Sequence, residues 1–396
     1  MPRLTLLKYH LLGLLWLALA LNYLDRQMVF SIYPALRRDL HFTGAQLGLI
    51  GSVFTWVYSL SMPVAGWLAD RVRRDRMIAG SMVLWSLTTL ACGLSHSVPV
   101  FLFFRALMGV TEALYYPAAA AILAESYAAA ARSRALGIHQ SAQLFGIIAG
   151  GWYGGYMADH FTWRAACALA ATGGAVYAAF LMRALPISRP APVADTNGRN
   201  PMAVPRSGGY QILSLAFFAH CAMLWIFYAW LPAHLAERFH LSMTESGFRA
   251  TVFVQLACGA GVVAGSYLAD RLGARFQVAA AGLLLAAPFG YLTFAATTPG
   301  AATLFSALYG FFAGLMIANA FAAAYEVVPV NQFGLAAGLL NMTGGIAATI
   351  MIYSAGVLKE TLGFDGLLGW IGLACVATAL LMGWYARARE MKREAA

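Results

Sequence analysis

The stretch Gly66-Trp67-Leu68-Ala69-Asp70-Arg71 follows a long apolar run and recurs in the second half of the chain as Gly265-Ser266-Tyr267-Leu268-Ala269-Asp270-Arg271. Further landmarks keep nearly the same offset: the segment 105–109 aligns with 306–310, Glu125 with Glu326, and Gly137 with Gly338. A repeat that is maintained across several landmarks predicts two structurally similar halves.

The composition places both halves in a membrane. Of 396 residues, 61% are hydrophobic and 11% are charged, whereas soluble domains carry about 25% charged residues. A membrane-spanning helix needs about 20 mostly apolar residues, so the chain has room for about twelve. The composition therefore excludes a water-soluble enzyme and a disordered chain, and it predicts a polytopic all-α membrane protein.

The apolar runs predict twelve transmembrane helices in two six-helix halves. The predicted spans are 10–36, 46–69, 77–94, 98–124, 136–158, 164–185, 209–236, 246–270, 276–295, 300–327, 334–358 and 366–386. The connection 186–208 is rich in Pro, Arg, Ser and Gly and has no apolar periodicity, so it is predicted to be a linker. The predicted domains are thus an N-terminal bundle, 1–185, a cytoplasmic linker, 186–208, and a C-terminal bundle, 209–396.

The net charge of +10 is distributed as the positive-inside rule requires, so it does not indicate a nucleic-acid partner. The side opposite the termini carries only Arg37, Arg38, Arg164, Arg238, Arg249 and Lys359. Both termini are therefore predicted to lie in the cytoplasm, with the protein in the inner (plasma) membrane. The first apolar run lacks a small-residue cleavage site, so we expect it to remain as a helix.

The strongest candidates for ionisable residues deep inside a predicted span all lie in the first half: Asp25, Arg26, Arg105 and Glu112. Charges within a membrane span are costly and by default mark a functional site. Because the four charges sum to zero, we expect two compensating pairs. They form either a static ion-pair cluster that joins two helices or a site that handles protons and an anion, and the cost of burial favours the second.

The aligned positions of the second half carry no charge. They are Ile226, Phe227, Ser306 and Ala313. That half instead offers polar and aromatic residues, namely His220, Trp225, Tyr228, Trp230, His234, Asn319 and Asn341. The contrast predicts a binding cleft whose charge chemistry is confined to one half.

The repeated loop also carries a possible conformational latch. Its predicted members are Asp70, Arg71 and Glu125 in the first half and Asp270, Arg271 and Glu326 in the second. Arginines of the first loop can pair with Glu125, and Glu326 stands near Arg271 and Arg275 in the same way. The alternative is a basic loop that only sets the orientation of the chain in the membrane.

The loop at 66–76 and its repeat resemble the signature of the major facilitator superfamily, which implies two six-helix bundles and a central cavity that opens alternately to each side. The motifs at 22–26, 105–113 with Pro117, and 133–137 resemble those of the anion:cation symporters, a group of sugar-acid and sialin-like transporters. The resemblance implies that Asp25 and Glu112 handle protons and that Arg26 binds the substrate carboxylate. It also implies that Arg105 belongs to the substrate site and pairs with the acidic groups there. Tyr23, Tyr58, Gln143 and Asn341 match positions that complete such pockets.

The expected function is therefore proton-coupled symport of an organic anion by a monomer, with the proton gradient as its only cofactor. The lack of charge in the second half favours a monocarboxylate with a neutral body. A spinster-like exporter of lysolipid or another amphiphile shares much of the same motif pattern, and a non-transporting membrane sensor is a third possibility. No phosphate-binding loop, catalytic triad or metal-spaced ligand set occurs in the sequence, which argues against an enzyme or a primary pump.

Overall fold

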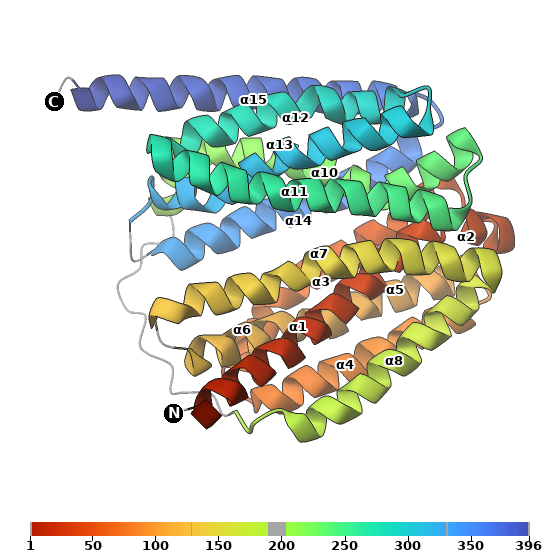
Figure 1. Ribbon diagram of the computed structural model, residues 1–396. Helices are drawn as coiled ribbons and strands as arrows, with labels where there is room; N and C mark the ends of the chain where they lie inside the picture. The colour runs from red at the N-terminus through yellow and green to blue at the C-terminus, as the bar shows by residue number, and fades with distance from the viewer. Residues whose placement is uncertain (1, 128, 189–202, 330–331, 395–396) are drawn as a thin grey trace. The chain divides into compact units, whose positions relative to one another are not determined.

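The computed structural model describes residues 2–127, 129–188, 203–329 and 332–394, and every regular element within them is an α-helix (Figure 1). The chain forms two compact units, residues 1–194 with 241–248 and residues 195–240 with 249–396. Residues 241–248 thus group with the first unit.

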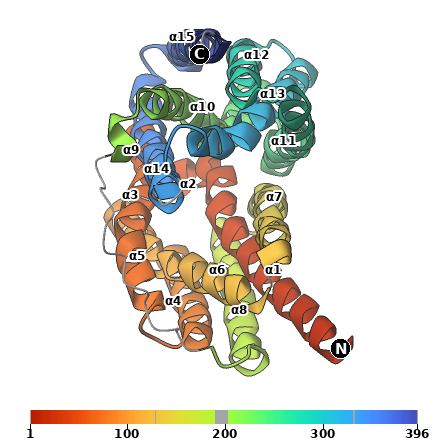
Figure 2. The ribbon, with the colours of Figure 1, turned by 90° about the vertical axis from the view of Figure 1, so that its left-hand side faces the viewer.

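The first unit is built from eight helical segments. They are α1 (Pro2–Ser31), α2 (Tyr33–Leu40), α3 (Gly44–Ala69), α4 (Arg74–Leu94), α5 (Val98–Ala113), α6 (Tyr115–Ser126), α7 (Ala129–His160) and α8 (Trp163–Ala184). Within this unit α1 packs on α7, α3 on α5, and α4 on α8 (Figure 2).

The second unit contains the remaining helices. They are α9 (Ala203–Arg206), α10 (Gly208–Phe239), α11 (Met243–Leu272), α12 (Arg275–Ala295), α13 (Pro299–Tyr325), α14 (Phe333–Leu358) and α15 (Gly363–Glu394). Here α12 packs on α13 and α15, while α10 packs on α14.

The predicted helical architecture is confirmed, with two changes. The first and fourth predicted spans are each broken, at Ile32 and at Leu114. Proline explains both breaks, because Pro34 and Pro117 lack the backbone N–H that would continue the helix across them. Ten helical segments of the described residues are long and apolar enough to cross a membrane; α1 and α7 are outside this set.

Glycines allow the closest helix contacts in both units. Gly146, Gly150 and Gly154 recur every fourth residue on α7, and a Cβ atom at any of them would collide with the backbone of α1. In the second unit Gly310 and Gly314 of α13 approach the α11 backbone in the same way. Small residues at such spacing let helix backbones pack without intervening side chains. The contact between α7 and α1 holds the segment of α1 that carries Asp25 and Arg26.

A candidate substrate and proton site

The candidate site lies in the first unit, where α1 and α5 carry its charged residues. Pro117 removes the hydrogen bond that would reach back to the carbonyl of residue 113, so α5 ends at Ala113 directly after Glu112. Glu112 therefore occupies the last turn of a helix inside the apolar body of the unit. Asp25 and Arg26 lie on α1, less than two turns before its end at Ser31.

Arg26 and Glu112 form a buried ion pair across these helices. The Nε atom of Arg26 lies 2.5 Å from Oε2 of Glu112, and the two side chains are 11% and 0% exposed. The other carboxylate oxygen, Oε1, has no hydrogen-bond partner within the described residues. Breaking such a pair by removing one partner typically costs about 3–5 kcal/mol, so the pair holds both side chains firmly.

Three aromatic rings surround the Arg26 guanidinium. Its Cζ atom lies 4.9 Å from the ring centre of Tyr23, 5.0 Å from that of Phe54 and 4.3 Å from that of Tyr58. Rings at these distances attract a cation and exclude water from its flanks. Tyr23 and Tyr58, two of the predicted site residues, thus adjoin Arg26.

Asp25 and Arg105 are buried, but they do not form the second ion pair that charge balance predicts. Oδ2 of Asp25 accepts a hydrogen bond of 3.2 Å from the hydroxyl of Thr89 on α4. Nη1 of Arg105 instead contacts the sulfur of Met108 at 3.1 Å, and Arg105 stacks on Phe54.

The expected pairing of Arg105 with an acidic group is therefore wrong for this structure. Its side chain is 1% exposed, yet Nε and Nη2 have no hydrogen-bond partner in the described part of the chain. Seven residues, about 10 Å along an α-helix, separate Arg105 from Glu112, and the hydrogen bond of Asp25 comes from Thr89. Arg26 reaches Glu112 from the facing helix instead. Buried donors without partners require an explanation such as a water or a ligand.

The other two predicted site residues are Gln143 and Asn341, one in each unit. Gln143 lies half-buried on α7, about one turn before Gly146. Asn341 lies exposed on α14 of the second unit, where its side-chain amide donates to the carbonyl of Ala337 on its own helix.

Two participants were not predicted from the sequence. Phe54 precedes Tyr58 by one helical turn, so its helical spacing was a usable signal. Thr89 is one of several hydroxyl residues on α4, and nothing in the sequence distinguishes it from its neighbours.

The latch residues form ion pairs in both units. In the first, Arg74 contacts Glu125 at 2.5 Å and Asp70 at 3.8 Å. In the second, Arg275 contacts Asp270 at 3.4 Å and Glu326 at 3.6 Å, and Glu326 also contacts Arg389 at 3.4 Å.

The arginines at the centre of these pairs differ from two of the predicted ones. Arg71 donates to the backbone carbonyl of Trp67 and lies over its ring at 4.2 Å, while Arg271 is exposed at the end of α11. Arg74 and Arg275 each begin the following helix, so the helix fixes their direction toward the acidic groups. Arg71 lies in the turn and lacks that constraint.

Comparison with known proteins places this architecture in a family. The sequence matches the Major Facilitator Superfamily over residues 15–210 and 213–396. The chain belongs to this superfamily. It is therefore a multi-pass membrane transporter rather than an enzyme.

Relatives of this transporter include two groups. A Bacillus subtilis protein described as a "probable galactarate/D-glucarate transporter", GudP, is 24% identical over 420 residues, which cover 95% of this chain and 91% of that protein. The human protein spinster homolog 1 is 30% identical over 314 residues, covering 69% of this chain and 58% of that one. Among solved structures, a bacterial homologue of human spinster in an inward-facing, unoccupied conformation matches with a TM-score of 0.78 at 19% identity, covering 96% of each chain. That structural likeness supports the superfamily fold.

Proposed function

We propose that this transporter moves an organic anion together with protons by alternating access. The Arg26–Glu112 ion pair carries the proposal, because a substrate carboxylate and the Glu112 carboxylate would compete for the same guanidinium. Burial makes this competition strong, since neither Arg26 nor Glu112 can exchange its partner for bulk water without cost.

The coupling follows from that competition. When Glu112 takes up a proton it becomes neutral and loses its hold on Arg26. The uncompensated guanidinium is then costly in a low-dielectric site, and a substrate carboxylate relieves the cost with two parallel hydrogen bonds. Proton binding and anion binding thereby favour one another.

Arg105 supplies a second cationic group for the substrate. Its Nε and Nη2 atoms are buried without hydrogen-bond partners in the described residues, and Phe54 contacts both Arg105 and Arg26. An anion held between the two arginines would satisfy donors that the protein leaves open.

Charge balance sets the expected proton count. Asp25, Arg26, Arg105 and Glu112 sum to zero when all are ionised. One proton on Glu112 gives the site a charge of +1, which matches a monocarboxylate, and a second proton on Asp25 gives +2, which matches a dicarboxylate. We therefore propose that the number of protons equals the number of substrate carboxylates.

Sugar acids are the proposed substrate class, because the relative GudP is named for galactarate and D-glucarate. The transporter is proposed to act as a monomer in the plasma membrane, with the proton gradient as its energy source. The Lys and Arg distribution supports cytoplasmic termini.

Binding of a carboxylate and its amide tests this function. Purified wild type and Arg26→Lys should be titrated with D-glucarate, D-gluconate and gluconamide. We expect wild type to bind the two acids and to bind the amide poorly. Arg26→Lys should lose most of this difference in affinity between acid and amide, because lysine keeps the charge but not the two-pronged geometry. Equal affinity of wild type for acid and amide would end the organic-anion assignment.

A spinster-like exporter of an amphiphile is the second candidate, and the 30% identity to human spinster homolog 1 supports the spinster-like assignment. That function predicts binding of neutral or zwitterionic lysolipids. It also predicts that truncating Trp225 and Tyr228, whose rings pack edge to face at 5.6 Å, lowers binding more than changing Arg26 does.

A further inference from the structure

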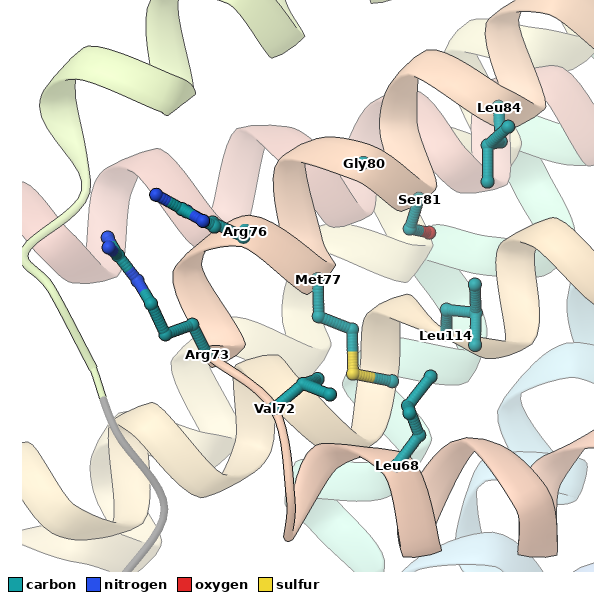
Figure 3. Close-up of a pocket in the computed structure, with 9 residues that line it drawn as sticks. All are labelled: Leu68, Val72, Arg73, Arg76, Met77, Gly80, Ser81, Leu84 and Leu114. Atoms are coloured by element: carbon teal, nitrogen blue, oxygen red, sulfur yellow. The ribbon is translucent and has the colours of Figure 1, made fainter.

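A cavity of about 370 Å³ lies in the first unit beside the first turns of α4 (Figure 3). It is an open cavity lined by the end of α3, the first turns of α4 and Leu114 at the junction of α5 and α6. Its apolar walls are formed by Leu68, Val72, Met77, Leu84 and Leu114. A cavity with this lining suits a hydrocarbon chain better than a hydrated solute.

The cavity opens on an apolar surface of the transporter. Leu84 is 45% exposed at its rim, and Leu87, one turn further along α4, is 57% exposed. On helices long and apolar enough to cross a membrane, such exposed side chains contact lipid. Lipid acyl chains therefore have direct access to the cavity.

One end of the cavity is positively charged. Arg73 and Arg76 lie at the start of α4, and their side chains extend in the same direction, away from the apolar walls (Figure 3). Arg73 is paired with Asp75 at 2.6 Å. Arg76 is exposed and has no hydrogen-bond or ion-pair partner within the described residues, so its charge is available to a ligand.

The neighbouring charges leave this end with a net positive balance. Arg74 is neutralised by Glu125 and Asp70, as Arg73 is by Asp75. Arg71 is exposed and contacts Trp67 through its ring and carbonyl rather than an acidic group. Tryptophan and arginine together are typical of the membrane–water interface.

We propose that this cavity binds an anionic phospholipid of the cytoplasmic leaflet, with an acyl chain between α3 and α4 and the phosphate on Arg76. The orientation rests on the predicted cytoplasmic position of this loop. The apolar walls select a lipid over a soluble anion, and the uncompensated arginines select an anionic headgroup over a zwitterionic one. Each basic residue near such a surface strengthens anionic lipid binding about five-fold.

Photocrosslinking tests the site. The full-length transporter is reconstituted in phosphatidylcholine vesicles that contain a trace of phosphatidylglycerol with a photoreactive acyl chain, and crosslinks are quantified on the peptide containing Met77 to Leu84. We expect unlabelled phosphatidylglycerol to compete for this peptide about five-fold better than phosphatidylcholine, and inorganic phosphate to compete poorly.

Two variants separate the headgroup from the chain. Arg76→Gln should remove the preference for phosphatidylglycerol while leaving crosslinking by a phosphatidylcholine probe. Gly80→Leu should reduce crosslinking by both lipids, because a Cβ at Gly80 meets nothing within 4 Å and the side chain can occupy the cavity without a backbone collision. Matched controls are Arg271→Gln, at an exposed arginine of the second unit's loop, and Gly173→Leu, at an open glycine of α8.

Three results would overturn the proposal. Unchanged crosslinking in both Arg76→Gln and Gly80→Leu would show that the cavity holds no lipid. Competition by inorganic phosphate equal to that by phosphatidylglycerol would assign the arginines to a soluble anion. Loss of the lipid preference in Arg271→Gln to the same degree would show that general positive charge, not this cavity, attracts the lipid.

Discussion

The two units share a scaffold but differ where the first carries its charges. The position of Arg26 corresponds to Phe227, whose ring stacks on Tyr309 with centroids 4.0 Å apart. The position of Arg105 corresponds to Ser306, which donates to the carbonyl of Thr303 on its own helix. Phe227 and Ser306 are each 1% exposed, so the second unit packs an apolar core where the first holds an ion pair.

Other features are the same in both units. An arginine at the start of the third long helix joins two acidic groups in each, and glycines bring helices into backbone contact in each. We attribute the features that both units share to the common fold and to the proposed latch. Among the described residues, buried carboxyl groups occur in the first unit only, and this contrast supports the proposal that Asp25 and Glu112 handle protons there.

The largest effect is expected when a carboxyl group of the charged unit is neutralised. Asp25→Asn and Glu112→Gln should each abolish proton-driven uptake, because neither side chain can then carry a proton through the cycle. Exchange of labelled for unlabelled substrate should persist. Uptake driven by a pH gradient in vesicles measures the first property and counterflow the second.

Glu360→Gln is the control for this experiment, since Glu360 is an exposed acidic residue of the second unit. It should transport normally. Undiminished proton-driven uptake in both Asp25→Asn and Glu112→Gln would remove the distinction between the two units.

The next largest effect is expected at Arg26, the residue that aligns with Phe227. Arg26→Lys should weaken carboxylate binding by about 10- to 100-fold, the equivalent of one charge-assisted hydrogen bond, and Arg26→Ala should weaken it further. Phe227→Leu should lower thermal stability slightly and leave anion affinity unchanged. Isothermal titration with D-glucarate measures both variants. Comparable losses of affinity in Arg26→Lys and Phe227→Leu would contradict a substrate site whose charged residues lie in the first unit.

A smaller effect on stability is expected at Arg105. Removing a buried charge that lacks an ion-pair partner relieves a desolvation cost, so Arg105→Gln should change the free energy of unfolding by less than about 1 kcal/mol. Substrate affinity should fall all the same, because one donor group is lost. Thermal unfolding and substrate titration measure the two properties. A large loss of stability would support the static cluster that joins helices.

The smallest effect is expected at the latch, where the units are alike. The Asp70 and Asp270 side chains are 53% and 72% exposed, and exposed ion pairs contribute about 0–1 kcal/mol. Asp70→Asn and Asp270→Asn should therefore each shift the balance of conformations by less than about five-fold, and to a similar extent. Spin-label distance distributions across both faces measure the shift. Unchanged distributions with normal transport would leave the loops a purely topological role.

Sequence patterns predicted the parts of this molecule that depend on composition and spacing. Apolar runs located the helices, and the repeated Asp70 and Asp270 loops located the ion pairs proposed as a latch. The partner of Glu112 was not predictable, because it depends on which facing helix brings a guanidinium within reach. Arg105 lies on the same face of α5 as Glu112, yet the seven residues between them keep its guanidinium from forming that ion pair. Thr89 and the choice of Arg74 over Arg71 likewise depend on side-chain directions that only the folded chain fixes.

Competition between Glu112 and the substrate for Arg26 is the central step of the proposed mechanism, and the pH dependence of substrate binding tests it directly. D-Glucarate affinity should be measured between pH 5 and pH 8 for wild type and Glu112→Gln. Protonation of Glu112 releases Arg26, so wild type should bind more tightly as the pH falls. Glutamine resembles the protonated acid, so the variant should bind tightly at high pH and lose most of this dependence. The same pH dependence in both proteins would contradict the account.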